Sequence, residues 1–227
     1  MYKIAVVGGI ASGKSTLVKY LGSYRYITNL NLDEMGHRVL REPSVTKELE
    51  NSFGTSIFYG SRDSDPELER ANFRSGKRIV NRRALGKIVF ADKTKFAVLN
   101  KIMWPQIAIF QNIALAQIEQ SRVASIAIIE GAVIIEAEFK KYYHEIWSVN
   151  LPKAVAVERL LKRNPDLTKA DAENRINSQI SDEERIKYSN YSIDSSRGIE
   201  ENKRIIDEKL KEFYDNGILK SLERKSH

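Results

Sequence analysis

The sequence has 227 residues, and it contains no cysteine and only three histidines. The absence of cysteine excludes disulfides, thiolate catalysis and any zinc site with cysteine ligands. The histidines, His37, His144 and His227, are far apart in the chain, so we do not expect a histidine-based metal centre either. A chain without disulfides fits a reducing compartment, and we expect a cytoplasmic protein.

Long apolar runs are also missing. The longest apolar patch, at 107–116, is interrupted by Gln111 and Asn112 and falls short of the roughly 18 residues that a membrane span needs. A strand pattern begins almost at the first residue, so we expect no secretory signal ahead of the fold. With 42% hydrophobic and 30% charged residues, the composition is that of a globular protein, and the length favours one domain.

The formal net charge is +7, and the lysines and arginines are spread along the chain rather than gathered in a basic tail. Such a charge is compatible with nucleic acid, with a membrane surface or with phosphorylated small molecules. The even spread favours small phosphorylated ligands. We therefore expect no nucleic-acid partner.

The clearest motif is a phosphate-binding loop near the start of the chain. Residues 8–15 match G-x-x-x-x-G-K-[ST], after the apolar run at 4–7 and before a helical pattern. Glycines leave backbone N–H groups aimed at phosphate oxygens, and the helix N-terminus adds partial positive charge. The motif predicts that nucleotide phosphates bind at Gly8, Gly9, Ile10, Ala11, Ser12, Gly13, Lys14, Ser15 and Thr16. Within it, Lys14 would reach the outer phosphates and Ser15 would join the Mg²⁺ shell.

Two acidic residues follow predicted strands. Asp33 follows a strand over about 26–32, and Glu130 closes an apolar strand over 123–129. Ligands collect beyond the carboxyl ends of parallel strands, so both carboxylates should lie near the loop. Glu130 would order Mg²⁺ directly or through water, although aspartate is more usual there. Asp33 could instead cap a helix over 34–40, or serve both purposes.

Helices account for most of the remaining chain. We expect helices at 44–53 and 82–90, and a long helix from the N-cap Asp92 to about 120 that Pro105 kinks or divides. Further strands at 146–151 and 191–194 precede a C-terminal helix at about 200–213. Between those strands, three short polar helices over 153–188 resemble a kinase lid, with Arg163 and Arg175 as candidate phosphate contacts. A solvated charged face with i,i+4 pairs is the alternative reading of the lid.

The loop motif alone does not distinguish kinases, GTPases and motors. A GTPase needs an Asn-Lys-x-Asp guanine reader, and the nearest match, Asn100-Lys101-Ile102-Met103, ends in methionine inside a predicted helix. The acid at Asp33 and the basic lid favour a small-molecule kinase. Another nucleoside or nucleotide kinase, or a non-catalytic nucleotide-dependent or RNA-binding protein, is the alternative.

The whole chain resembles the dephospho-coenzyme A kinases. Beyond the phosphate loop, the resemblance rests on the order and spacing of six stretches, at 32–38, 81–90, 129–136, 159–164, 175–179 and 191–194. It implies an α/β fold of the P-loop NTPase type, a three-layer α/β/α arrangement around a parallel sheet with a helical substrate-binding insertion and a helical lid. Within one domain over 1–227, the nucleotide core would comprise about 1–33, 122–152 and 189–215, the acceptor-binding region about 34–121, and the lid about 153–188.

The resemblance also implies an activity, the transfer of the ATP γ-phosphoryl group to the ribose 3′-hydroxyl of dephospho-CoA, with Mg²⁺ as cofactor. Asp33 would orient or deprotonate the hydroxyl, while Lys14 and Arg163 would neutralise phosphate charge. The acceptor would contact Asp33, Arg82, Arg83, Trp104 and Arg175. Association with other enzymes of coenzyme A biosynthesis would be consistent with this activity.

Three features depart from the usual family pattern. Asn31-Leu32-Asp33 replaces an Asp-x-Asp pair, retaining the second aspartate, and Trp104-Pro105 replaces the His-Pro of bacterial members. The polar stretch 60–77 is longer than the usual connection, and its role is open. The sequences Ile102-Met103-Trp104-Pro105 and His144-Glu145-Ile146-Trp147 are similar to the kinase domain of the animal bifunctional CoA synthase, which indicates a eukaryotic-type member without the adenylyltransferase half.

Overall fold

The computed structural model describes residues 1–60 and 79–225. It divides into two compact units, the first formed by Met1–Asp33 with Ile113–His227 and the second by Glu34–Asn112. The polar stretch at 60–77 lies outside the described residues except for Gly60. Among the described residues, no helix combines the length and apolar character that crossing a membrane requires.

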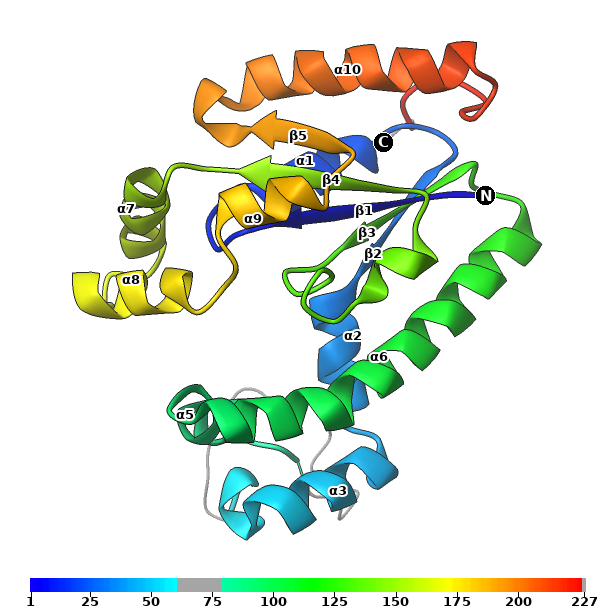
Figure 1. The fold of residues 1–227 in the computed structure, drawn as a ribbon. Coiled ribbons are helices and arrows are strands. Elements are labelled where there is room, and N and C mark those ends of the chain that lie inside the picture. The colour runs from blue at the N-terminus through cyan, green and yellow to red at the C-terminus, as the bar shows by residue number, and fades with distance from the viewer. Residues whose placement is uncertain (61–78, 226–227) are drawn as a thin grey trace. The chain divides into compact units, whose positions relative to one another are not determined.

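A five-stranded parallel sheet forms the centre of the first unit (Figure 1). Its order is β2-β3-β1-β4-β5, and the strands are β1 (Tyr2–Gly8), β2 (Ile27–Asn31), β3 (Ile126–Glu130), β4 (Glu145–Asn150) and β5 (Tyr191–Asp194). β1 lies in the middle, paired with β3 on one side and β4 on the other. The parallel α/β fold predicted from the sequence is therefore confirmed.

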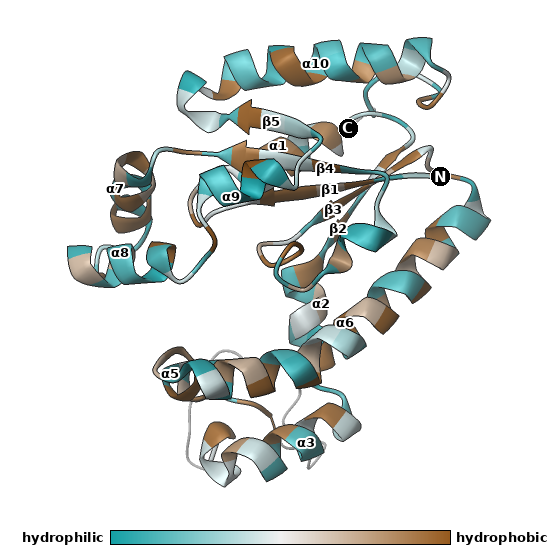
Figure 2. Cartoon of the chain, in the orientation of Figure 1, coloured by the Kyte–Doolittle hydropathy of each residue, from teal (hydrophilic) through white to brown (hydrophobic). Residues whose placement is uncertain are grey.

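Helices cover both faces of the sheet. On one face, α1 (Lys14–Leu21) and α10 (Ile199–Asp215) pack on Ile4, Val6 and Trp147 in a single apolar core. On the other face lies α9 (Asp182–Lys187) (Figure 1). The inner strands are mainly hydrophobic, as buried parallel strands must be, whereas α10 alternates hydrophobic and hydrophilic residues (Figure 2).

The lid segment consists of three helices, α7 (Lys153–Arg163), α8 (Lys169–Asn177) and α9, as the sequence predicts. Thr168 and Asp171 form the reciprocal capping box that starts α8. At α9, Ser181 accepts a hydrogen bond from the backbone of Glu184, whereas the Glu184 side chain binds Lys187.

The second unit contains most of α2 (Leu32–Val39), then α3 (Pro43–Phe53), η1 (Thr55–Ile57), α5 (Arg82–Phe90) and the first part of α6 (Lys93–Ser121). It has its own apolar core, which includes Val39, Leu49 and Val89. Asn81 caps α5 and Asp92 caps α6, the latter as predicted. This unit lies within the predicted acceptor-binding region, and its binding role stays a prediction.

The structure corrects several predicted boundaries. β3 begins at Ile126 rather than Val123, because Arg122 takes a positive φ after α6 and leaves Val123 exposed. The division of α6 at Trp104 is wrong, because the helix continues through Pro105. Proline removes one backbone donor, and the apolar side chains around it, including Met103 and Ile107, pack into the core of the second unit.

Candidate functional site

The phosphate loop connects the end of β1 to α1, and its backbone depends on glycine at two places. A Cβ on Gly8 would lie 2.4 Å from the backbone oxygen of Val149, so only glycine permits this close approach to β4. Gly13 has φ +92°, in the left-handed region that favours glycine, immediately before the helix. These constraints hold the loop at the carboxyl end of the sheet.

A pocket of about 460 Å³ opens at this loop. It is lined by loop residues 10–16 and by six further residues, Asp33, Glu130, Ala132, Arg159, Arg163 and Gln179. Of the predicted site residues, the structure thus brings together the loop, both strand-end carboxylates and one lid arginine.

Lys14 occupies the centre of the loop. Its Nζ donates hydrogen bonds to the backbone oxygens of Gly8 at 2.7 Å and Gly9 at 3.0 Å. Burial lowers the pKa of its ammonium group below the usual range, opposed by the nearby carboxylates of Glu130 and Asp33. The ammonium group is therefore held among the loop carbonyls, where nucleotide phosphates would compete for it.

Glu130 is buried at the end of β3. Its carboxylate accepts a hydrogen bond of 2.6 Å from the Ser15 hydroxyl and one of 3.5 Å from the Asn31 side-chain amide. A hydroxyl and a carboxylate are the hard oxygen donors that Mg²⁺ prefers. These residues fit a magnesium ion that completes its shell with phosphate oxygens and water.

Asp33 lies in the first turn of α2 and is exposed. The backbone N–H of Asp33 donates to the Asn31 side-chain oxygen at 2.9 Å, so Asn31 caps the helix. The reading of Asp33 as the helix cap is therefore wrong, because the helix begins at Leu32. Asp33 lines the pocket, and the negative charge of its carboxylate acts on the Lys14 ammonium group.

Two arginines of the lid segment line the pocket, and they are held in different ways. Arg159 donates to the Ser195 hydroxyl and backbone oxygen, both at 3.2 Å, and is anchored beside β5. Arg163, at the C-terminal end of α7, is exposed and lines the pocket. Arg175 of α8 is not among the lining residues, and its role stays a prediction.

The predicted acceptor residues Arg82, Arg83 and Trp104 all lie in the second unit. Arg82 contacts the His37 ring and lines a small pocket of about 70 Å³. Arg83 is exposed, while Trp104 is partly buried against the apolar core. Trp104 therefore packs as a structural residue whether or not it also contacts an acceptor.

Sequence reasoning did not identify Arg159, Gln179 or the helix-capping role of Asn31. Gln179 and Arg159 have no spacing that marks them as site residues, because tertiary folding brings them to the loop. Asn31 carried one signal, since asparagine directly before a helical pattern is a common cap.

The family model for dephospho-CoA kinase matches residues 2–201. A dephospho-CoA kinase from Saccharomyces cerevisiae is 30% identical over 198 residues, which cover 86% of this chain and 76% of that protein. One from Dehalococcoides mccartyi is 29% identical over 203 residues, covering 89% of this chain and 93% of that protein.

Solved structures show the same fold. A crystal structure from Thermus thermophilus superposes with a TM-score of 0.71 at 24% sequence identity. The match covers 93% of this chain and 97% of the Thermus thermophilus chain. A dephospho-CoA kinase from Campylobacter jejuni has a TM-score of 0.62 at 19% sequence identity. The match covers 95% of this chain and 98% of the Campylobacter jejuni chain. The match over residues 2–201 confirms the resemblance seen in the sequence, and this chain belongs to the dephospho-CoA kinase family.

Proposed function

We propose that this chain transfers the γ-phosphoryl group of ATP to the ribose 3′-hydroxyl of dephospho-CoA, giving CoA and ADP. One observation carries the chemical part of the proposal. The exposed carboxylate of Asp33 and the ammonium group of Lys14 line the same pocket as the phosphate loop. Phosphoryl transfer needs an oriented acceptor hydroxyl, a charge-neutralising cation and fixed phosphates. Dephospho-CoA brings the hydroxyl, which Asp33 can orient, while Lys14 can neutralise charge and the loop can fix the phosphates.

In this proposal, backbone N–H groups of the loop hold the phosphates, and Lys14 leaves the carbonyls of Gly8 and Gly9 to bind the outer phosphate oxygens. Asp33 orients the acceptor hydroxyl and takes its proton as the new bond to phosphorus forms. Arg163 stabilises the charge on the transferring group, and lid residues exclude water.

Ser15 and Glu130 would hold Mg²⁺. A bound Mg²⁺ ion would neutralise phosphate charge and fix the orientation of the β- and γ-phosphates. The hydrogen bond between the two side chains supports this assignment, because it brings two suitable oxygen donors together beside the loop.

We assign acceptor binding to the second unit, with Arg82, Arg83 and Trp104 as contacts, and a further acceptor contact to Arg175 in α8. The cationic side chains suit the phosphates of dephospho-CoA. A cytoplasmic location and association with other enzymes of coenzyme A biosynthesis stay predictions from the sequence.

A coupled assay of ADP release tests the proposed acceptor. Dephospho-CoA, nucleosides and nucleoside monophosphates are compared as acceptors at equal ATP and Mg²⁺. We expect ADP release to depend on dephospho-CoA and to stay near the acceptor-free rate with the others. Faster release with a nucleoside or nucleotide would identify a different kinase, and salt-sensitive RNA binding without ADP release would favour the non-catalytic alternative.

A further inference from the structure

One side chain of the lid segment forms a hydrogen bond with the backbone of the phosphate loop. The Oε1 atom of Gln179, in the turn between α8 and α9, accepts a hydrogen bond of 2.8 Å from the backbone N–H of Ile10. Gln179 is half-buried, and its Oε1 lies 3.8 Å from the position that a Cβ on Gly9 would take. Gln179 therefore lies close to the loop at Gly9 and engages the backbone N–H of Ile10, so this N–H is not available to bind phosphate while the bond lasts.

The turn that carries Gln179 is fixed by Arg185. The Arg185 side chain is 1% exposed. It forms an ion pair with Asp182 and donates a hydrogen bond of 2.9 Å to the backbone oxygen of Ile180. Asp182 in turn accepts a hydrogen bond of 2.8 Å from the backbone N–H of Leu151, after β4. Arg185 and Asp182 thus connect the turn to the sheet.

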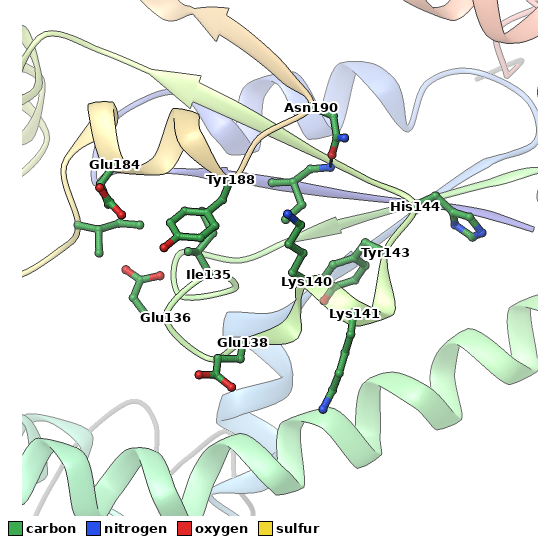
Figure 3. Close-up of a pocket in the computed structure, with 12 residues that line it drawn as sticks. Ile135, Glu136, Glu138, Lys140, Lys141, Tyr143, His144, Glu184, Tyr188 and Asn190 are labelled. Atoms are coloured by element: carbon green, nitrogen blue, oxygen red, sulfur yellow. Dashed lines mark hydrogen bonds between the residues drawn. The ribbon is translucent and has the colours of Figure 1, made fainter.

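A second carboxylate offsets the charge of Arg185. Burial lowers the pKa of its guanidinium group, whereas the negative charges of Asp182 and Glu136 act in the opposite direction. Glu136 lines a pocket of about 790 Å³ beside α9, together with Glu184 and Tyr188 (Figure 3). Leaving a buried cation without its paired carboxylate is costly, so the ion pair of Arg185 with Asp182 stabilises the position of the turn.

The apolar side of the lid also packs on the loop. Val157 and Leu160 of α7 form a small core with Ala172 of α8, and Ile10 and Ala11 pack against it. The Ile10 side chain and the Ile10 backbone are therefore both held by the lid segment.

We propose that Gln179 is a positioning residue for the phosphate loop, which it holds through the Ile10 N–H, and that Arg185 and Asp182 fix the turn from which it acts. A loop that is ordered before binding loses less conformational freedom when phosphates bind. Removing the hydrogen bond between the Ile10 N–H and Gln179 should therefore weaken nucleotide binding. The inference rests on the proposed function only in taking a nucleoside triphosphate as the ligand of this pocket.

Gln179→Met tests the inference, because methionine keeps the size of the side chain and removes the acceptor. The matched control is Gln120→Met, at an exposed glutamine on α6. Hydrogen exchange of the Ile10 amide is measured without nucleotide, and affinity for a non-hydrolysable ATP analogue is measured by calorimetry without acceptor. For Gln179→Met we expect faster Ile10 exchange and about three- to tenfold weaker binding, the range for one lost hydrogen bond, with Gln120→Met like wild type.

Unchanged Ile10 exchange, or unchanged affinity, in the Gln179→Met variant would overturn the proposal. Gln179→Glu retains an acceptor and should restore slow Ile10 exchange, even if its charge repels phosphate. It also serves as the second variant if Gln179→Met folds poorly. Wild-type protein that bound no ATP analogue would contradict the proposed function, whereas the nucleotide-free exchange comparison would still decide whether Gln179 holds Ile10.

Discussion

Asp33 and Glu130 carry the same functional group in different surroundings. Glu130 is 6% exposed and accepts hydrogen bonds from Ser15 and Asn31, so its oxygens are directed toward the loop. Asp33 is exposed, and Asn31 binds its backbone rather than its carboxylate. These surroundings suit Glu130 to holding a cation in place and Asp33 to meeting a substrate that enters from solvent.

The Asp33→Asn variant should therefore lose turnover without losing its fold. We expect kcat to fall by about 10²–10⁴, the usual contribution of a positioned general base, with the KM for ATP changed little. Steady-state kinetics with dephospho-CoA measure both values. Asp215→Asn, an exposed position near the end of α10, is the control and should behave like wild type. A decrease of only a few-fold in Asp33→Asn would show that another group activates the acceptor.

Residues with a local signature could be predicted from the sequence. The spacing from Gly8 to Ser15 identifies the loop, and the strand-end positions of Asp33 and Glu130 follow from the parallel sheet. Gln179 could not be predicted in this way, because the turn between α8 and α9 reaches Ile10 only through tertiary packing.

Among the elements, the lid helices differ in how firmly their arginines are held. Arg159 of α7 donates twice to Ser195, which fixes it beside β5. Arg163 is exposed at the end of the same helix and lines the pocket at the phosphate loop. An exposed arginine that lines the pocket is better suited to follow charge that develops during transfer.

Arg163→Ala should lower kcat by about tenfold or more, because charge on the transferring phosphoryl group would lose a cation. Lys162→Ala removes an adjacent, exposed positive charge from the same helix and is the matched control. Measuring kcat for both variants, and for Arg175→Ala, identifies the lid arginine that contributes most. Equal effects of Arg163→Ala and Lys162→Ala would indicate general electrostatic attraction rather than a specific contact.

Helix ends were predictable where a capping side chain marks them, as at Asp92 and Thr168. At Pro105 a kink and a division of the helix were both open, and only the division is wrong. The apolar packing that retains the helix there is not visible locally. Likewise, Val123 is apolar next to a strand, although Arg122 turns the chain before the strand begins.

At the scale of the molecule, the buried Tyr24 and the partly buried Tyr20 link α1 to α10 and to the C-terminal segment. The hydroxyls of Tyr20 and Tyr24 donate to Asp207 of α10, and Arg224 stacks over both rings. Burial, together with hydrogen bonding to Asp207, raises the pKa of Tyr24.

Tyr2 is shifted in the same direction, because burial and the neighbouring Glu145 carboxylate raise its pKa to about 12. The neutral phenols are therefore favoured by the folded state.

Stability should consequently fall at alkaline pH. In the unfolded chain these tyrosines ionise near pH 10, whereas in the folded protein they keep their protons to higher pH. Their stabilisation is thus fully present below about pH 10 and is lost as the pH rises through the folded-state pKa values. Urea unfolding at about pH 9 and about pH 11 should show a lower midpoint at the higher pH.

Tyr24→Phe should reduce this pH dependence, since one of the shifted groups is removed. Tyr214→Phe, at an exposed tyrosine on α10, is the control and should retain the wild-type slope. An identical loss of stability in Tyr24→Phe and wild type between the two pH values would contradict the assignment to Tyr24.

The position that receives the phosphoryl group tests the proposed function most directly. ATP with an isotopic label in its γ-phosphate is incubated with Mg²⁺, dephospho-CoA and the protein, and the product is analysed by mass spectrometry and ³¹P NMR. We expect one labelled phosphomonoester, on the ribose 3′-hydroxyl, formed in equal amount to ADP. Label recovered only as inorganic phosphate, or on another acceptor position, would contradict the proposed function.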